Sequence, residues 1–138
     1  MSDKTYNGSC LCNKVKFKIT GAITNIIYCH CSKCRKAQGS AFATNGNVDT
    51  DKFKFITGEN ALTSYKPSKD QTKYFCKFCG SPILSKNSHN PDKVRVRIGT
   101  IESDITEHPE AHIFVNSKAN WEKIESDLPQ FEAYQPEL

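Results

Sequence analysis

Short segments in which apolar and polar residues alternate dominate the chain, and helical periodicity is scarce. Val15, Phe17 and Ile19 alternate with polar residues before Gly21, which is typical of a strand with one buried face. Similar alternation, or a short apolar run between turn residues, predicts further strands at 24–29, 41–48, 53–56, 62–65, 72–75, 82–84, 93–99 and 111–115. The pattern therefore predicts a mainly β fold of many short strands.

Two segments depart from this strand pattern. Residues 32–37 and 121–125 have the spacing of single helical turns, and the tail from Pro129 onward is expected to be extended. Within the predicted strand at 93–99, Lys93, Arg95 and Arg97 alternate with valines. This alternation predicts a half-buried strand whose charged side chains face solvent.

Length and composition indicate one ordered domain over residues 1–138, with a core at about 6–131 and an extended C-terminal tail. Hydrophobic residues make up 37% and charged residues 25%, values close to those of ordinary globular proteins. No apolar run is long enough to cross a bilayer, and the N-terminus lacks the apolar stretch of a signal peptide. We therefore expect a cytoplasmic protein, and no part of the pattern indicates an oligomeric state.

The net charge of +4 is mildly basic, and the positive residues are spread along the chain. Domains that bind nucleic acid usually gather such charge on one stripe or face. The charge pattern therefore argues against a nucleic-acid partner.

Cysteine is the residue type that changes the picture most. All seven cysteines fall in three clusters, Cys10-x-Cys12, Cys29-x-Cys31-x-x-Cys34 and Cys76-x-x-Cys79. Such close pairs present thiolates to a metal, whereas disulfide frameworks use scattered partners. A structural zinc takes four protein ligands, and a catalytic zinc takes three and leaves one position open. Seven cysteines therefore suggest one closed and one open zinc site.

Two groupings of the cysteines fit this arithmetic. In the first, Cys10, Cys12, Cys76 and Cys79 form the closed shell, and Cys29, Cys31 and Cys34 form the open site. In the second, Cys31 and Cys34 join Cys76 and Cys79 as a zinc ribbon with a long insertion. Spacing alone leaves both groupings open.

The middle cluster also contains candidates for other roles. Lys33, Arg35 and Lys36 stand beside the three thiolates, where they can offset negative charge and attract an anionic ligand. His30 lies between two cysteines, and adjacent residues of an extended segment point to opposite faces, so it is not expected to bind the metal. His112 and Trp121 are expected to be structural.

Taken together, the cysteine stretches and two C-terminal segments resemble one known family. The segments are Gly8-Ser-Cys10-Leu-Cys12, Cys29-His-Cys31-Ser-Lys-Cys34-Arg-Lys-Ala-Gln-Gly39-Ser-Ala-Phe42, Tyr74-Phe-Cys76-Lys-Phe-Cys79-Gly-Ser, Ala111-His-Ile-Phe-Val-Asn-Ser-Lys-Ala-Asn-Trp121 and Leu128-Pro-Gln-Phe131. They resemble the glutathione-dependent formaldehyde-activating enzyme family, which includes centromere protein V. The resemblance runs from about Tyr6 to Phe131.

The resemblance implies the first grouping, with a structural zinc on Cys10, Cys12, Cys76 and Cys79 and a catalytic zinc on Cys29, Cys31 and Cys34. It also implies a compact fold of packed short antiparallel sheets, similar to methionine sulfoxide reductase B and to certain Rab regulators. The family commonly has glycine after the Cys-x-Cys pair, where this chain has Asn13. Asparagine tolerates left-handed backbone, so the turn is expected to survive.

The activity implied is that of a carbon–sulfur lyase, which forms or cleaves S-(hydroxymethyl)glutathione or a related thiol adduct of formaldehyde. Its partners would be a small-molecule thiol and an aldehyde, with glutathione as co-substrate and its carboxylates held by Lys33, Arg35 and Lys36. We expect the three-cysteine site, drawn from one short loop, to be partly occupied by zinc in some preparations. The alternative is a non-catalytic thiol carrier or a zinc-stabilised interaction module.

Overall fold

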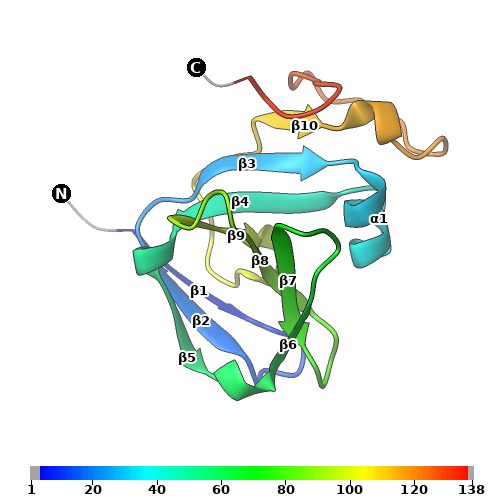
Figure 1. Cartoon of the computed structure of the whole chain (residues 1–138). Helices are drawn as coiled ribbons and strands as arrows, with labels where there is room; N and C mark the ends of the chain where they lie inside the picture. Colours follow the sequence, from blue (N-terminus) through cyan, green and yellow to red (C-terminus); the bar gives the residue numbers. More distant parts are fainter. Residues whose placement is uncertain (1–3, 137–138) are drawn as a thin grey trace.

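The computed structural model describes residues 4–136, and most of its regular structure is β-strand (Figure 1). The strands are β1 (Thr5–Ser9), β2 (Lys16–Thr20), β3 (Thr24–Cys29), β4 (Ala43–Asp49), β5 (Phe53–Thr57), β6 (Leu62–Tyr65), β7 (Gln71–Cys76), β8 (Pro82–Asn87), β9 (Lys93–Arg97) and β10 (Ala111–Ile113). The single α-helix of the described residues is α1 (Ser32–Gln38), and short 3₁₀ turns cover Thr50–Lys52, Glu59–Ala61, Ile98–Thr100 and Val115–Ser117.

The strands form two sheets. The smaller sheet has the order β1-β2-β5, and the larger has the order β10-β3-β4-β9-β8-β7-β6. Every neighbouring pair is antiparallel except β10 and β3, which are parallel. Within the described chain, no helix is long and apolar enough to span a bilayer.

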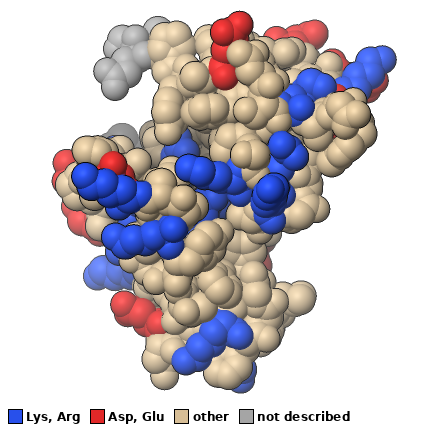
Figure 2. Space-filling view, turned by 45° about the vertical axis from the view of Figure 1, so that its right-hand side comes forward, with Lys and Arg blue, Asp and Glu red and all other residues tan. Residues whose placement is uncertain are grey.

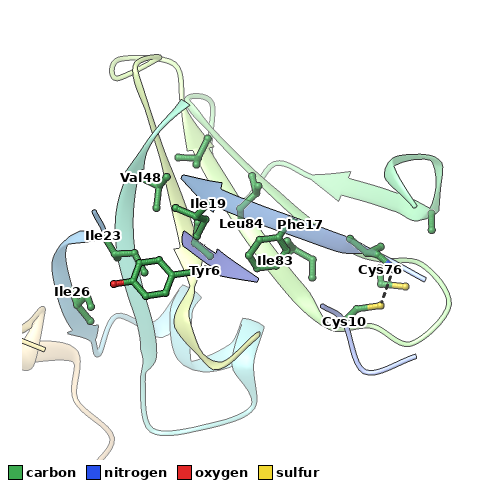
Figure 3. Packing of buried hydrophobic residues seen from close by; sticks show 14 residues of the cluster. Tyr6, Cys10, Phe17, Ile19, Ile23, Ile26, Val48, Cys76, Ile83 and Leu84 are labelled. Carbon is green, nitrogen blue, oxygen red and sulfur yellow. Dashed lines mark hydrogen bonds between the residues drawn. The ribbon is translucent and has the colours of Figure 1, made fainter. Parts of the chain in front are cut away.

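The main core lies between the two sheets. Phe17 and Ile19 of β2 meet Val48, Val94 and Val96 from the middle of the larger sheet, and all five are buried. Figure 3 shows this packing, with Tyr6 and Ile83 at the same interface. Fully burying a side chain of this size stabilises the fold by about 1.5–3 kcal/mol, so burial of the alternating apolar residues is the main contribution to stability.

The other face of the larger sheet is the one that carries the site. Because Val94 and Val96 point into the main core, Arg95 and Arg97 point to the opposite face. Strand register places Asn45 of β4 beside Arg97, and Ser85 of β8 beside Arg95. A smaller apolar cluster covers one end of this face and consists of Ile27, Cys29, Cys34, Ala43, Ala111 and Ile113, with Cys31, Phe114 and Phe131 packed against it.

The mainly β fold predicted from the sequence is confirmed, and each predicted strand is present, with ends that are either the same or shifted by a few residues. Two predictions are wrong. Residues 121–125 form no helix beyond a turn at Trp121, and the strand with the alternating cations does not have a fully solvated face, because Arg97 is only 4% exposed. The tail lies against β10, where the N–H of Phe131 donates to the His112 carbonyl over 2.9 Å.

Glu107 ties the smaller sheet to the loop that precedes β3. Its carboxylate accepts hydrogen bonds from the Tyr6 hydroxyl and from the Ile23 N–H, the latter at 2.9 Å, and Lys4 Nζ lies 3.7 Å away. Burial acts to raise the pKa of Glu107, but the hydrogen bonds from Tyr6 and Ile23 outweigh it and lower that pKa from 4.5 to about 2. The folded state therefore favours the carboxylate form.

We expect Glu107→Gln to lower the free energy of unfolding by about 1–3 kcal/mol at pH 7, because it replaces charge-assisted hydrogen bonds. A lowered pKa contributes stability that is present above about pH 4.5 and is lost as the pH falls toward 2. Urea unfolding of both proteins should therefore show a difference that shrinks from pH 7 to pH 3. Glu125→Gln, at a side chain 76% exposed, is the control and should change stability by less than about 0.5 kcal/mol. A difference that does not vary with pH would contradict this role of Glu107.

Candidate metal centres

Two turns from distant parts of the chain bring four cysteines together. Cys10 and Cys12 lie in the turn between β1 and β2, whereas Cys76 ends β7 and Cys79 lies in the turn that follows it. Their four sulfur atoms all lie within 4.8 Å of one another. Cys10 and Cys76 are buried at the end of the main core, where Figure 3 shows their sulfur atoms side by side. The structure therefore groups these four and not the ribbon alternative.

Backbone hydrogen bonds hold these turns in shape. The Val15 N–H donates to Cys10 Sγ over 3.3 Å, and the Leu11 N–H donates to Ser81 Oγ over 2.9 Å. Asn13 has φ 67°, so this residue, which stands where the resemblance implies glycine, adopts the left-handed backbone expected of it. The turn is therefore kept despite the substitution.

The donor set and spacing of this group fit a zinc ion. A tetrahedral zinc with four thiolates at about 2.3 Å has sulfur–sulfur edges of about 3.8 Å. The Cys10–Cys12 and Cys12–Cys76 sulfur distances are 3.6 Å and 3.8 Å, far longer than a disulfide bond. We call this cluster the four-cysteine group.

A second group lies at the junction of β3 and α1. Cys29 ends β3, Cys31 is the N-cap residue of α1, and Cys34 lies in the first turn of that helix. Their sulfur atoms also lie within 4.8 Å of one another, with Cys29 and Cys34 buried and Cys31 half-buried. Three thiolate donors fit a zinc ion that keeps one position for another ligand. We call this cluster the three-cysteine group.

The helix start makes Cys31 the sulfur best placed to carry negative charge. Its Sγ accepts a hydrogen bond from the Cys34 N–H over 3.3 Å, as an N-cap side chain does. Hydrogen bonds with Cys29 and Cys34 lower the pKa of Cys31. The hydrogen bonds of Cys29 with Cys31 and Cys34 raise the pKa of Cys29. The three thiols therefore favour a shared anionic state over three neutral groups.

A pocket of about 260 Å³ opens beside the three-cysteine group. All three cysteines line it, together with Ser32, Lys33, Asn45, Gln71, Lys73, Ser85, Arg95, Arg97, Phe114, Ser117 and Tyr134. The pocket therefore draws on β3, α1, β4, β7, β8, β9 and the C-terminal segment. No member of the four-cysteine group lines this pocket.

The three basic residues predicted beside the thiolates take different places. Lys33 is exposed and lines the pocket, whereas Arg35 and Lys36 are not among the lining residues. Arg35 is half-buried, and its Nε has no hydrogen-bond partner in the described structure. Lys36 is exposed. The structure thus brings one of the three to the pocket.

Sequence reasoning missed three other cations that line the pocket, Arg95 and two buried ones. Lys73 is 6% exposed and Arg97 is 4% exposed, and both line the pocket. Burial lowers the pKa of Lys73 and of Arg97, and the nearby Cys34 opposes both shifts. The signal in the sequence was the strand alternation, which marked Arg97 as facing away from the core without showing what covered it.

His30 is held away from the metal candidates, as its position between two cysteines predicts. It is fully buried, and its Nε2 lies 2.9 Å from Nδ1 of His112, whose Nε2 in turn lies 2.9 Å from Ser126 Oγ. The rings of His30 and His112 also contact each other, with centroids 5.1 Å apart. His112 is therefore structural, as expected, whereas Trp121 is 68% exposed and has no comparable role in packing.

Comparison with known proteins places the chain among relatives. A family model described as glutathione-dependent formaldehyde-activating enzyme matches residues 5–117. A protein of Emericella nidulans provisionally given that name is 32% identical over 77 residues, and two with the same provisional name, from Aspergillus flavus and Aspergillus oryzae, are each 30% identical over 79 residues. Each match covers 56% of the chain and 39% or 41% of the relative, so the chain spans about two fifths of these relatives' length.

A solved structure also resembles the chain. The crystal structure of a Rhodobacter sphaeroides protein superposes with a TM-score of 0.61 at 21% sequence identity, and the match covers 75% of this chain and 97% of that one. This likeness shows a shared fold. Since the family model covers most of the chain and spans both cysteine groups, the chain belongs to the glutathione-dependent formaldehyde-activating enzyme family.

Proposed function

We propose that residues 1–138 form one zinc-binding domain that acts as a carbon–sulfur lyase. Its reaction is the formation or cleavage of S-(hydroxymethyl)glutathione or a related thiol adduct of formaldehyde. Family membership supports this reaction class. The observation that carries the proposal is the convergence of three cysteine sulfurs on the wall of a polar pocket.

The two cysteine groups are proposed to have different roles, one structural and one catalytic. Four thiolates complete a zinc shell, so the four-cysteine group is assigned a structural role. Three thiolates leave a position for a ligand from the pocket, so the three-cysteine group is assigned the catalytic role. Because all its donors come from one short segment, we propose that it holds zinc more weakly.

The reaction joins a thiol to an aldehyde. The thiol sulfur attacks the carbonyl carbon, a carbon–sulfur bond forms, and the carbonyl oxygen takes the proton that the thiol gives up; cleavage is the reverse. When bound, zinc would keep the thiol ionised at neutral pH and fix the position of its sulfur.

The residues around the sulfur atoms supply binding and orientation. Lys33 at the edge of the pocket attracts an anionic thiol, and the amides of Asn45 and Gln71 and the hydroxyl of Ser85 offer hydrogen bonds to the polar parts of the ligand. Partners of this chemistry, a small thiol and an aldehyde, fit a pocket of about 260 Å³. The seven cysteines carry no disulfide, which supports a reducing, cytoplasmic setting for the protein.

The proposal predicts that the zinc-loaded protein speeds the exchange of formaldehyde between its free and glutathione-bound forms. NMR exchange measurements with ¹³C-formaldehyde and glutathione, with and without the protein, would report this rate directly. We expect an increase of at least about tenfold over the uncatalysed exchange, given the typical gain from orienting reactants. Saturable binding of glutathione with no increase in the exchange rate would instead establish the carrier alternative.

A further inference from the structure

The pocket beside the three-cysteine group is strongly cationic. Four of its lining residues are positively charged, Lys33, Lys73, Arg95 and Arg97, and none is acidic. Figure 2 shows lysine and arginine side chains gathered across the middle of one face of the molecule, with acidic side chains toward its margins. An anion entering this pocket therefore meets a positive potential with no competing carboxylate.

Two of these cations are buried without an acidic partner. Lys73 and Arg97 are 6% and 4% exposed, and none of the ion pairs among residues 4–136 involves either of them. Nε and Nη1 of Arg97 are also without a hydrogen-bond partner. A buried charge without a partner destabilises a fold, so its retention calls for an anion that is supplied from elsewhere.

Asn45 adds a third unpartnered group at the same place. It is 1% exposed, it stands directly across from Arg97 in the β4–β9 pairing, and both its Oδ1 and its Nδ2 lack hydrogen-bond partners. Native proteins seldom leave a buried amide without partners unless a ligand or water completes them. Lys73, Arg97 and Asn45 lie on three strands of one sheet, so their backbone positions are rigid.

The cysteines alone do not balance this charge. Three thiolates with one divalent cation carry a single net negative charge, against four positive charges that line the pocket. Most of the positive charge is therefore left for the ligand to neutralise.

We infer that Asn45, Lys73 and Arg97 form an anion-binding floor in this pocket, and that this floor selects thiols that also carry a carboxylate. The inference rests on the proposed function for the identity of the reacting group, which is the thiol. It assigns carboxylate recognition to buried sheet residues and leaves the helix cations Arg35 and Lys36 outside the pocket. The exposed Lys33 then contributes attraction at the rim.

The test compares two ligands. One has carboxylates but no ionisable sulfur, and the other has an ionisable thiol but no carboxylate. Binding of S-methylglutathione to the zinc-loaded protein is measured by calorimetry, and exchange of formaldehyde with 2-mercaptoethanol is measured by NMR. The variants are Lys73→Gln, Arg97→Gln and Asn45→Asp, the last of which puts a negative charge into the floor. Lys18→Gln, at an exposed residue of β2, is the matched loss of one positive charge, and Lys73→Arg restores the charge.

We expect the Kd for S-methylglutathione to rise roughly 10- to 100-fold in each floor variant, since Lys73→Gln and Arg97→Gln each lose a charge-assisted interaction and Asn45→Asp adds a carboxylate that repels the ligand. Lys18→Gln should leave that Kd unchanged, and Lys73→Arg should recover most of the affinity. Exchange with 2-mercaptoethanol should fall by a clearly smaller factor than the affinity for S-methylglutathione, because this thiol has no carboxylate for the floor to bind. Should Arg97→Gln fail to fold, Lys73→Gln and Asn45→Asp still decide the question.

An unchanged Kd for S-methylglutathione in Lys73→Gln and Arg97→Gln would contradict the anion-binding role of the floor. Loss of zinc from the three-cysteine group without a change in that Kd would also overturn it, by showing that the cations serve the thiolates alone. If the wild-type protein binds S-methylglutathione and the floor variants weaken that binding, but the wild type never accelerates exchange, the anion-binding role of the floor is supported and the proposed lyase activity is wrong.

Discussion

Replacing Cys76 by serine is expected to cost the protein most of its stability. Cys76 is fully buried at the end of β7 and is one of the four sulfurs that join the β1–β2 turn to the β7–β8 turn. A structural zinc contributes about 10–16 kcal/mol of apparent binding energy in small zinc domains, which is as large as the whole stability of a typical fold. Loss of one of four thiolates should forfeit a large part of this energy.

The measurement is thermal unfolding followed by circular dichroism, alongside zinc content. We expect the midpoint of unfolding to fall by more than about 10 °C, or the variant to be recovered unfolded. Cys31→Ser makes the same chemical change in the three-cysteine group and should shift the midpoint far less. A Cys76→Ser protein that melts with the wild type and keeps the same zinc content would show that the four-cysteine group is not a structural zinc site.

Replacing Cys31 by serine is expected to abolish turnover while the fold remains. Cys31 is the half-buried member of its group and lines the pocket, so its sulfur is the one most open to a ligand. Serine is a preferred N-cap residue, so its hydroxyl can accept the Cys34 N–H hydrogen bond that Cys31 Sγ accepts now. Helix α1 should therefore form in the variant, and the loss should be confined to the metal donor.

We expect formaldehyde exchange with glutathione to fall at least about 100-fold in Cys31→Ser, with zinc reduced to the content of one site. Circular dichroism and the unfolding midpoint serve as the check on the fold. Cys12→Ser, at the exposed member of the four-cysteine group, is the comparison that removes a thiol without touching the pocket. Unchanged exchange in a folded Cys31→Ser protein would rule out a catalytic metal on Cys29, Cys31 and Cys34.

Most of the fold could be predicted because alternation is a local signal, and β1 shows where that signal ends. In β1 the buried positions are Tyr6 and Gly8, and Gly8 has no side chain to mark its position as apolar. A Cβ at Gly8 would lie 2.1 Å from Phe17 Cζ, so the ring of Phe17 occupies the space instead. The strand is thus specified by a side chain in its neighbour β2, which a pattern within β1 cannot reveal.

The site could be predicted in part for a related reason. The cysteine spacing predicted metal ligands, but two groupings remained open because the choice depends on which turns the packed sheets bring together. Strand alternation placed Arg97 away from the core, yet whether that face meets water or a pocket depends on α1, β7 and the C-terminal segment. Residues whose surroundings come from distant parts of the chain, such as Lys73, carry no local signature of their role.

The two cysteine groups differ in how far along the chain their members lie, and this sets the order in which they can assemble. Cys29, Cys31 and Cys34 belong to one continuous segment, whereas Cys12 and Cys76 are separated by 64 positions. During synthesis the five N-terminal thiols are therefore all present before Cys76 and Cys79 emerge from the ribosome. A metal ion captured early has to be held by these five alone, and the four-cysteine shell closes only when the β7–β8 hairpin docks.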